Sequence, residues 1–115
     1  MGTLRAGVIG LSFGKHHTRI LSEMDEIDLV GVSDLNSGKS VIADKYGISF
    51  FNKYKDLLKM DLDIALAVVP TKQHCEVAMT IMESGVHCFV EKPIAYSIDE
   101  AKSMIECSDT NNVKF

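Results

Sequence analysis

The sequence lacks the features that mark several classes of protein. No apolar run approaches the ~20 residues that a membrane span needs. The N-terminus has no charged segment followed by an apolar one, as a secretory signal peptide would have. Lysine and arginine form no cluster, which argues against nucleic acid as a partner. We therefore expect a cytoplasmic protein without a role at membranes or on nucleic acids.

The cysteines are scattered and irregularly spaced. The three cysteines, Cys75, Cys88 and Cys107, are odd in number and include no Cys-x-x-Cys spacing, so neither a disulfide framework nor a zinc site is expected. The pair His16 and His17 has no third ligand nearby in the sequence, and no metal site is expected there. We interpret the cysteines as reduced thiols that pack as small apolar groups.

What the sequence does contain is a regular alternation of short apolar runs and helical patterns along 115 residues, a length that suits one domain over residues 1–115. Strands are expected at 4–9, 27–33, 48–51, 64–69 and 86–90, with a sixth opening at 113–115. Helices are expected at 15–24, 37–46, 53–59 and 73–84, with another beginning at Ser97. Strict alternation predicts an α/β fold, a Rossmann-type doubly wound parallel sheet in a three-layer αβα arrangement.

Three of the expected helices carry apolar stripes at helical spacing. The predicted buried faces are His17, Ile20, Leu21 and Met24; His74, Val77, Ala78, Ile81 and Met82; and Ile98, Ala101, Met104 and Ile105. Gly47 and Gly85 stand where C-terminal caps belong. Ser97 and Glu100 have the spacing of an N-terminal capping box.

A glycine turn follows the first expected strand. Gly10 and Gly14 bracket the junction of strand and helix, where glycine lets the backbone approach a pyrophosphate at the helix N-terminus. Asp34 ends the second expected strand, 24 residues after Gly10. An acid about 20 residues beyond such glycines can accept hydrogen bonds from the ribose hydroxyls and repels a 2′-phosphate. The combination predicts a dinucleotide site that favours NAD over NADP.

The same turn also fits a different motif. Gly10-Leu11-Ser12-Phe13-Gly14 matches the G-x-S-x-G nucleophile elbow, in which Ser12 would be the nucleophile of a hydrolase. The turn follows the first strand and the chain is short for the usual hydrolase fold, so we expect the match to be accidental.

Further motifs follow the fourth and fifth expected strands. With the glycine turn, they make the sequence resemble the Gfo/Idh/MocA family, the glucose-fructose oxidoreductase and inositol dehydrogenase group. The matching pieces are Gly7-Val8-Ile9-Gly10, Asp34, Asp61-Leu62-Asp63, Pro70 with His74, Glu91-Lys92-Pro93 and Ser97-Ile98-Asp99-Glu100-Ala101. The resemblance implies an NAD(P)-dependent dehydrogenase or reductase that acts on a sugar, cyclitol or related hydroxy compound.

The resemblance also implies roles for individual residues. The turn from Gly10 through Leu11, Ser12 and Phe13 to Gly14 would line the pyrophosphate, and Asp34 would hold the ribose. Pro70, Thr71 and His74 would border the nicotinamide half, and Glu91 and Lys92 the nicotinamide ribose and the substrate. Lys92 would be the catalytic residue, because a fixed ammonium can stabilise a developing alkoxide. Judged from the residues alone, His74 and His17 are as consistent with packing on their helix faces as with a functional role.

Two departures from the family pattern stand out. The glycine turn is one residue short and has Ser12 in place of a glycine, which predicts an altered pyrophosphate contact. Family members continue into a sheet-rich substrate domain, and the expected strand at 113–115 is the last of this sequence. We therefore expect the cofactor half of an enzyme, inactive alone, with a non-catalytic dinucleotide sensor as the alternative. Self-association through an uncovered edge strand stays open.

Overall fold

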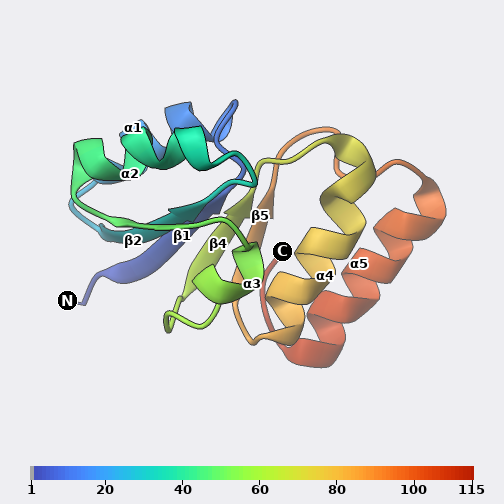
Figure 1. The fold of residues 1–115 in the computed structure, drawn as a ribbon. Coiled ribbons are helices and arrows are strands. Elements are labelled where there is room, and N and C mark those ends of the chain that lie inside the picture. Colours follow the sequence, from blue (N-terminus) through green and yellow to red (C-terminus); the bar gives the residue numbers. More distant parts are fainter. Residues whose placement is uncertain (1) are drawn as a thin grey trace.

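Five strands form one parallel sheet in the computed structural model, which describes residues 2–115 (Figure 1). The strands are β1 (Leu4–Ile9), β2 (Ile27–Ser33), β3 (Ser49–Phe51), β4 (Ile64–Ala67) and β5 (His87–Val90). Their order across the sheet is β3-β2-β1-β4-β5, and every neighbouring pair is parallel. The order reverses direction between β1 and β4, which is where open α/β sheets bind ligands.

Helices cover both faces of this sheet. The helices are α1 (Gly14–Ser22), α2 (Ser40–Tyr46), α3 (Tyr54–Leu57), α4 (His74–Glu83) and α5 (Ile98–Asn111), with 3-10 turns η1 (Ser37–Lys39) and η2 (Thr71–Gln73). Helices α1 and α2 lie on one face, and α3, α4 and α5 on the other (Figure 1). The predicted Rossmann-type α/β fold is confirmed. No helix in the described part of the chain combines the length and the apolar character that crossing a membrane requires.

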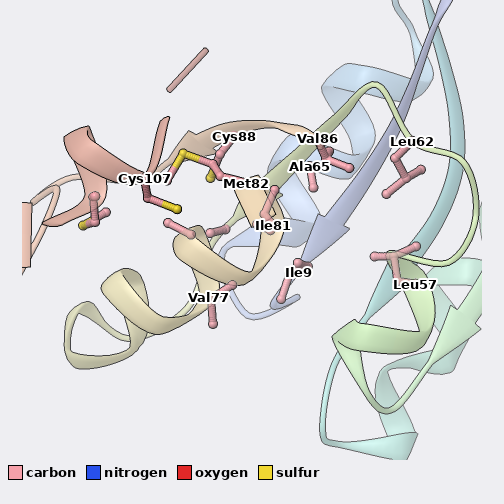
Figure 2. Close-up of a cluster of buried hydrophobic side chains, with 13 residues drawn as sticks. Ile9, Leu57, Leu62, Ala65, Val77, Ile81, Met82, Val86, Cys88 and Cys107 are labelled. Atoms are coloured by element: carbon pink, nitrogen blue, oxygen red, sulfur yellow. The ribbon is translucent and has the colours of Figure 1, made fainter. Parts of the chain in front are cut away.

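Successive side chains of the central strand β1 point alternately into two hydrophobic cores, one on each face of the sheet. Val8 points to the face of α1 and α2, where it packs with Leu11 and Val32. Ile9 points to the opposite face, where side chains from α3, α4, β5 and α5 form the larger cluster shown in Figure 2. Both cores meet the carboxyl end of β1, so packing on both faces fixes the strand that leads into the glycine turn.

The buried face of α4 is as predicted, whereas that of α1 is only partly so: Leu21 packs against the core and His17 is half-buried, but the other two predicted residues are exposed. His74, Val77, Ala78, Ile81 and Met82 are all buried. On α1 the buried residues are Gly14 and Thr18, and Ile20 is 47% exposed. The reason is close approach: a Cβ at Gly14 would lie 3.0 Å from Val8 Cγ1, so this helix rests on the sheet through small residues. Met24 lies beyond the end of α1 and is also exposed.

The prediction for α5 was wrong at two of its four positions. Met104 is buried and Ala101 is half-buried, but Ile98 and Ile105 are exposed. Since α5 packs against α4, its buried stripe is narrow and continues at Cys107. Half of the predicted capping box is present: Ser97 Oγ accepts a hydrogen bond from Glu100 N at 3.1 Å, whereas Glu100 Oε1 accepts one from Tyr96 N instead of Ser97 N.

The remaining boundaries differ by a few residues. Strands β3, β4 and β5 and helix α3 are shorter than predicted, and the expected helix at 37–46 begins with the turn η1. Gly47 is the C-cap of α2 and Gly85 directly follows Ser84, the C-cap of α4; both glycines have a positive φ. The segment Val113–Phe115 is not a strand, although Cys88 N donates a hydrogen bond to Lys114 O at 2.9 Å. It therefore runs beside β5 without forming a regular ladder.

All three cysteines are free thiols. Cys88 and Cys107 are buried in the larger core, where Figure 2 shows them beside Met82, and Cys75 is half-buried. Burial raises the pKa of Cys88 to about 12. The interpretation of the cysteines as packing groups is confirmed.

Candidate functional site

A groove of about 570 Å³ opens at the carboxyl edge of the sheet. Its walls come from the glycine turn, the ends of β2 and β4, the turn η2 and the residues after β5. This volume lies within the usual range of small-molecule sites, about 300–1,000 Å³. Every predicted site residue except Gly14 lines the groove. Gly14 lies beneath it, packed against Val8.

Gly10 is the residue on which the shape of the turn depends. Its φ is +90°, and a Cβ placed there would lie 2.1 Å from the carbonyl oxygen of Val68. Gly10 N donates to Ser33 O at 2.8 Å, so the turn is also joined to the end of β2. Only glycine fits, because any side chain would collide with backbone rather than with a movable side chain.

The turn leads into a free helix N-terminus. Phe13 is the N-cap of α1 and offers no side-chain hydrogen bond, and the first helical turn contains no acid. Ser12 and Phe13 are exposed at the groove. A helix N-terminus with no acidic or capping group of its own favours an anion such as a phosphate.

Asp34 bonds directly to this turn. Its Oδ2 accepts a hydrogen bond from Leu11 N, and its Oδ1 accepts one from Asn36 N, both at 2.8 Å. An ionised carboxylate has about four acceptor positions, so each oxygen can accept a further hydrogen bond from a ligand in the groove. The acid is thus held in place at the groove wall while it keeps acceptor capacity.

Asn52 is a groove residue that the sequence did not reveal. Its Nδ2 lies 3.2 Å from Asp34 O and 3.1 Å from Ser37 Oγ, so it supports the backbone that presents the acid. Asn52 directly follows β3, which is the neighbour of β2. Its position beside Asp34 could be found only once the strand order was known.

The turn after β5 presents Lys92. Glu91 Oε1 accepts a hydrogen bond from Lys92 N at 3.0 Å, and Glu91 Oε2 lies 2.9 Å from His17 Nε2. The backbone N–H of Lys92 and, next, the imidazole of His17 hold the pKa of Glu91 below its ordinary value. Lys92 itself is exposed, and no carboxylate in residues 2–115 lies within ion-pair distance of its ammonium.

His74 joins the ends of β4 and β5. The side chain is 1% exposed, and its two ring nitrogens each lie 2.8 Å from a carbonyl oxygen, Nε2 from that of Val69 and Nδ1 from that of Pro93. These contacts connect the two backbone segments that border the groove near Lys92. The histidine is therefore buried, as the packing alternative predicts, and its role at the groove stays a prediction.

In the described part of the chain, Ser12 lacks the partners that the nucleophile of a hydrolase needs. No hydrogen bond in residues 2–115 joins Ser12 to a histidine, and both ring nitrogens of His74 contact carbonyl oxygens. Residues 2–115 also contain no group of three or more His, Cys, Asp or Glu side chains that could hold a metal ion. The groove instead combines a glycine turn, an open helix N-terminus and an anchored acid.

Comparison with known proteins agrees with this geometry. Residues 4–115 match the model of GFO_IDH_MocA, described as an oxidoreductase family with an NAD-binding Rossmann fold. The chain belongs to this family. Membership of this family supports dinucleotide binding rather than the hydrolase interpretation of Ser12.

Several members of the family match this chain over most of its length. Inositol 2-dehydrogenase of Salmonella typhimurium is 28% identical over 115 residues, which is 95% of this chain. UDP-N-acetylglucosamine 3-dehydrogenase of Acidithiobacillus ferrooxidans is 33% identical over 104 residues, 89% of this chain, and its structure matches with a TM-score of 0.91 over 98%. The structure of myo-inositol 2-dehydrogenase from Lactobacillus plantarum is 29% identical and matches with a TM-score of 0.87 over 95%.

This chain covers only part of each of these proteins. It spans 34% of the Salmonella typhimurium protein and 32% of the Acidithiobacillus ferrooxidans protein. In the two solved structures it matches 37% and 34% of the chain. The shared region is the NAD-binding oxidoreductase domain of the family.

Proposed function

We propose that the groove binds NAD in preference to NADP, with the adenosine ribose at Asp34 and the pyrophosphate at the glycine turn. The observation that carries the proposal is the Asp34 carboxylate, which is fixed by Leu11 N and Asn36 N and keeps acceptor positions for ribose hydroxyls. The same negative charge would repel a 2′-phosphate. Neither Leu35 nor Asn36 is a basic residue that could bind one.

The residues present fit the cofactor. Gly10 leaves the space where a Cβ would meet backbone, and Phe13 and Gly14 begin a helix whose N-terminus is open to a phosphate. Pro70, Thr71 and His74 would border the nicotinamide half, with His74 acting by holding the backbone carbonyls on either side. Glu91 would border the nicotinamide ribose.

For the whole protein we propose hydride transfer between a nicotinamide cofactor and a hydroxyl of a sugar, cyclitol or related compound. The cofactor, when bound, supplies the hydride acceptor or donor. Lys92 would hydrogen-bond the reacting oxygen, because its ammonium is exposed at the groove and no carboxylate in residues 2–115 neutralises it. A positioned ammonium stabilises a developing alkoxide and assists proton transfer.

The proposed substrate class rests on the relatives, two of which are an inositol 2-dehydrogenase and a UDP-N-acetylglucosamine 3-dehydrogenase. We expect substrate contacts to come mainly from outside residues 1–115, so that these residues alone bind cofactor without turnover. No observation favours the alternative of a non-catalytic sensor. A cytoplasmic location and homo-oligomer formation remain predictions.

Mapping of the bound cofactor by NMR tests the proposed site. Titration with NAD is expected to shift the backbone amide signals of Gly10, Ser12 and Asp34, because these line the groove. The signals of Arg5 and Asp61, which bond each other where β1 begins, serve as an internal control and should stay in place. Shifts confined to another surface, or no shifts at saturating NAD, would contradict the assignment.

A further inference from the structure

His17 makes a contact that packing on the sheet does not explain. It lies on α1, which follows the glycine turn, yet its Nε2 is 2.9 Å from Oε2 of Glu91, which is 74 residues away in the sequence. The imidazole also packs against Phe89 of β5, with ring centroids 5.8 Å apart and planes tilted by 58°. The imidazole is 26% exposed and the Glu91 side chain 37%, so the contact is partly shielded from water.

The other oxygen of the same carboxylate holds Lys92. Glu91 Oε1 accepts a hydrogen bond from Lys92 N at 3.0 Å, so one carboxylate connects α1 to the backbone of the predicted catalytic lysine. An ionised carboxylate only accepts hydrogen bonds, so His17 must be the donor in its contact with Glu91. The carboxylate is therefore fixed from two directions.

The turn after β5 is held from both faces of the sheet. On the face of α1, His17 acts through Glu91; on the face of α4, His74 contacts Pro93 O at 2.8 Å. Lys92 lies between these two attachment points in the sequence. If His17 were lost, Glu91 would be free to rotate toward the neighbouring Lys92 ammonium and neutralise it.

We propose that His17 is a positioning residue that orients Glu91 and thereby places Lys92 at the groove. This inference rests on the proposed role of Lys92. His17 is not among the residues that line the groove, so it acts through Glu91 rather than on the cofactor or the substrate. It also couples the helix at the pyrophosphate end of the groove to the lysine at the nicotinamide end.

The geometry supplies a matched set of variants. Because the contact uses Nε2, the glutamine side chain in His17→Gln is long enough for its amide nitrogen to reach Glu91. The asparagine side chain in His17→Asn is too short to do so. His17→Ala removes the donor altogether. The adjacent His16 is exposed and its side chain makes no hydrogen bond within residues 2–115, so His16→Ala is the control for loss of a histidine on this helix.

The test is the backbone amide of Lys92, followed by NMR in the chain without cofactor. His17→Ala and His17→Asn are expected to shift its signal and to speed its hydrogen exchange about five- to tenfold, the effect of one lost hydrogen bond of about 1 kcal/mol. His17→Gln and His16→Ala should leave both near the wild-type values. Thermal unfolding of each variant shows whether the fold is retained, and His17→Gln keeps the test valid if His17→Ala does not fold.

The inference is overturned if the Lys92 amide is unchanged in His17→Ala, or if asparagine restores it as well as glutamine. Titration of the same variants with NADH separates this outcome from failure of the proposed function. A wild-type chain that does not bind NADH would refute the cofactor proposal while leaving the Lys92 amide result intact. A chain that binds NADH but shows no response of Lys92 to His17 would refute only the positioning role.

Discussion

Replacing Gly10 with alanine is expected to lower the free energy of unfolding by about 2–5 kcal/mol and to remove dinucleotide binding. The residue has φ +90°, and the added Cβ would lie 2.1 Å from Val68 O. An L-residue in such a conformation costs about 1–2 kcal/mol. Relief of the collision requires movement of backbone that is bonded on both sides, through Gly10 N to Ser33 O and through Val68 N to Ile9 O.

Gly85→Ala is the matched control for this prediction. Gly85 also has a positive φ, +79°, but nothing lies within 4 Å of the position that a Cβ would take. Its substitution should therefore cost only the conformational term, about 1–2 kcal/mol. Urea denaturation of the two variants measures the difference, and equal losses of stability would show that the close approach at Gly10 is unimportant.

Replacing Asp34 with alanine is expected to weaken NADH binding about ten- to a hundredfold, because a hydrogen bond to a charged group contributes about 1.5–3 kcal/mol. Binding of NADPH should weaken less or improve, since repulsion of its 2′-phosphate disappears. Part of the loss in the alanine variant comes from the turn itself, because Asp34 also accepts the hydrogen bond from Leu11 N. The affinities for both cofactors can be measured by the fluorescence of the reduced nicotinamide.

Asp34→Asn separates the effect of the negative charge on cofactor binding from the effect of the hydrogen bond that holds the turn. Asparagine keeps one acceptor oxygen but no negative charge, so the ratio of NADPH to NADH affinity should rise while the turn is largely retained. Asp28→Asn makes the same change of charge at an exposed carboxylate paired with Arg5, outside the groove, and should leave both affinities unchanged. An unaltered cofactor preference in Asp34→Asn would refute the role given to this acid.

The parts of the site that follow from local sequence could be predicted. Gly10 and Asp34 each follow a strand, and parallel strands bring their carboxyl ends to one edge, so their proximity was expected and the structure shows it. The contacts of Asn52 and His17 depend on strand order and on the path of α1, neither of which a local pattern specifies. They were therefore missed as site features, and His17 was interpreted as part of an apolar stripe.

The buried faces of the helices show a second limit of sequence patterns. Apolar spacing located the face of α4 because this helix lies between the sheet and α5 and buries a wide stripe. It succeeded only in part on α1, where Gly14 and Thr18 allow the helix to approach the sheet and the larger Ile20 is left outside. Small residues at a close contact give no apolar signal, so the periodicity found Leu21 on this face but missed Gly14 and Thr18.

The shortened glycine turn leads directly into the first turn of α1. Gly14 is the first residue of α1, and Leu11 N is bonded to Asp34 rather than left free for a phosphate. The pyrophosphate contacts are thus expected at the exposed Ser12 and Phe13 and at the start of the helix.

Titration of the wild-type chain with NADH and NADPH tests the central claim most directly. The claim is that the groove binds a dinucleotide and that Asp34 sets the preference for NADH. The chain contains no tryptophan, so the emission of the reduced nicotinamide itself can be followed without interference. Saturable binding of NADH below millimolar concentration, with NADPH binding more weakly, is the predicted result. Failure of both cofactors to bind at millimolar concentration would contradict the groove as a dinucleotide site, and tighter binding of NADPH would contradict the role of Asp34.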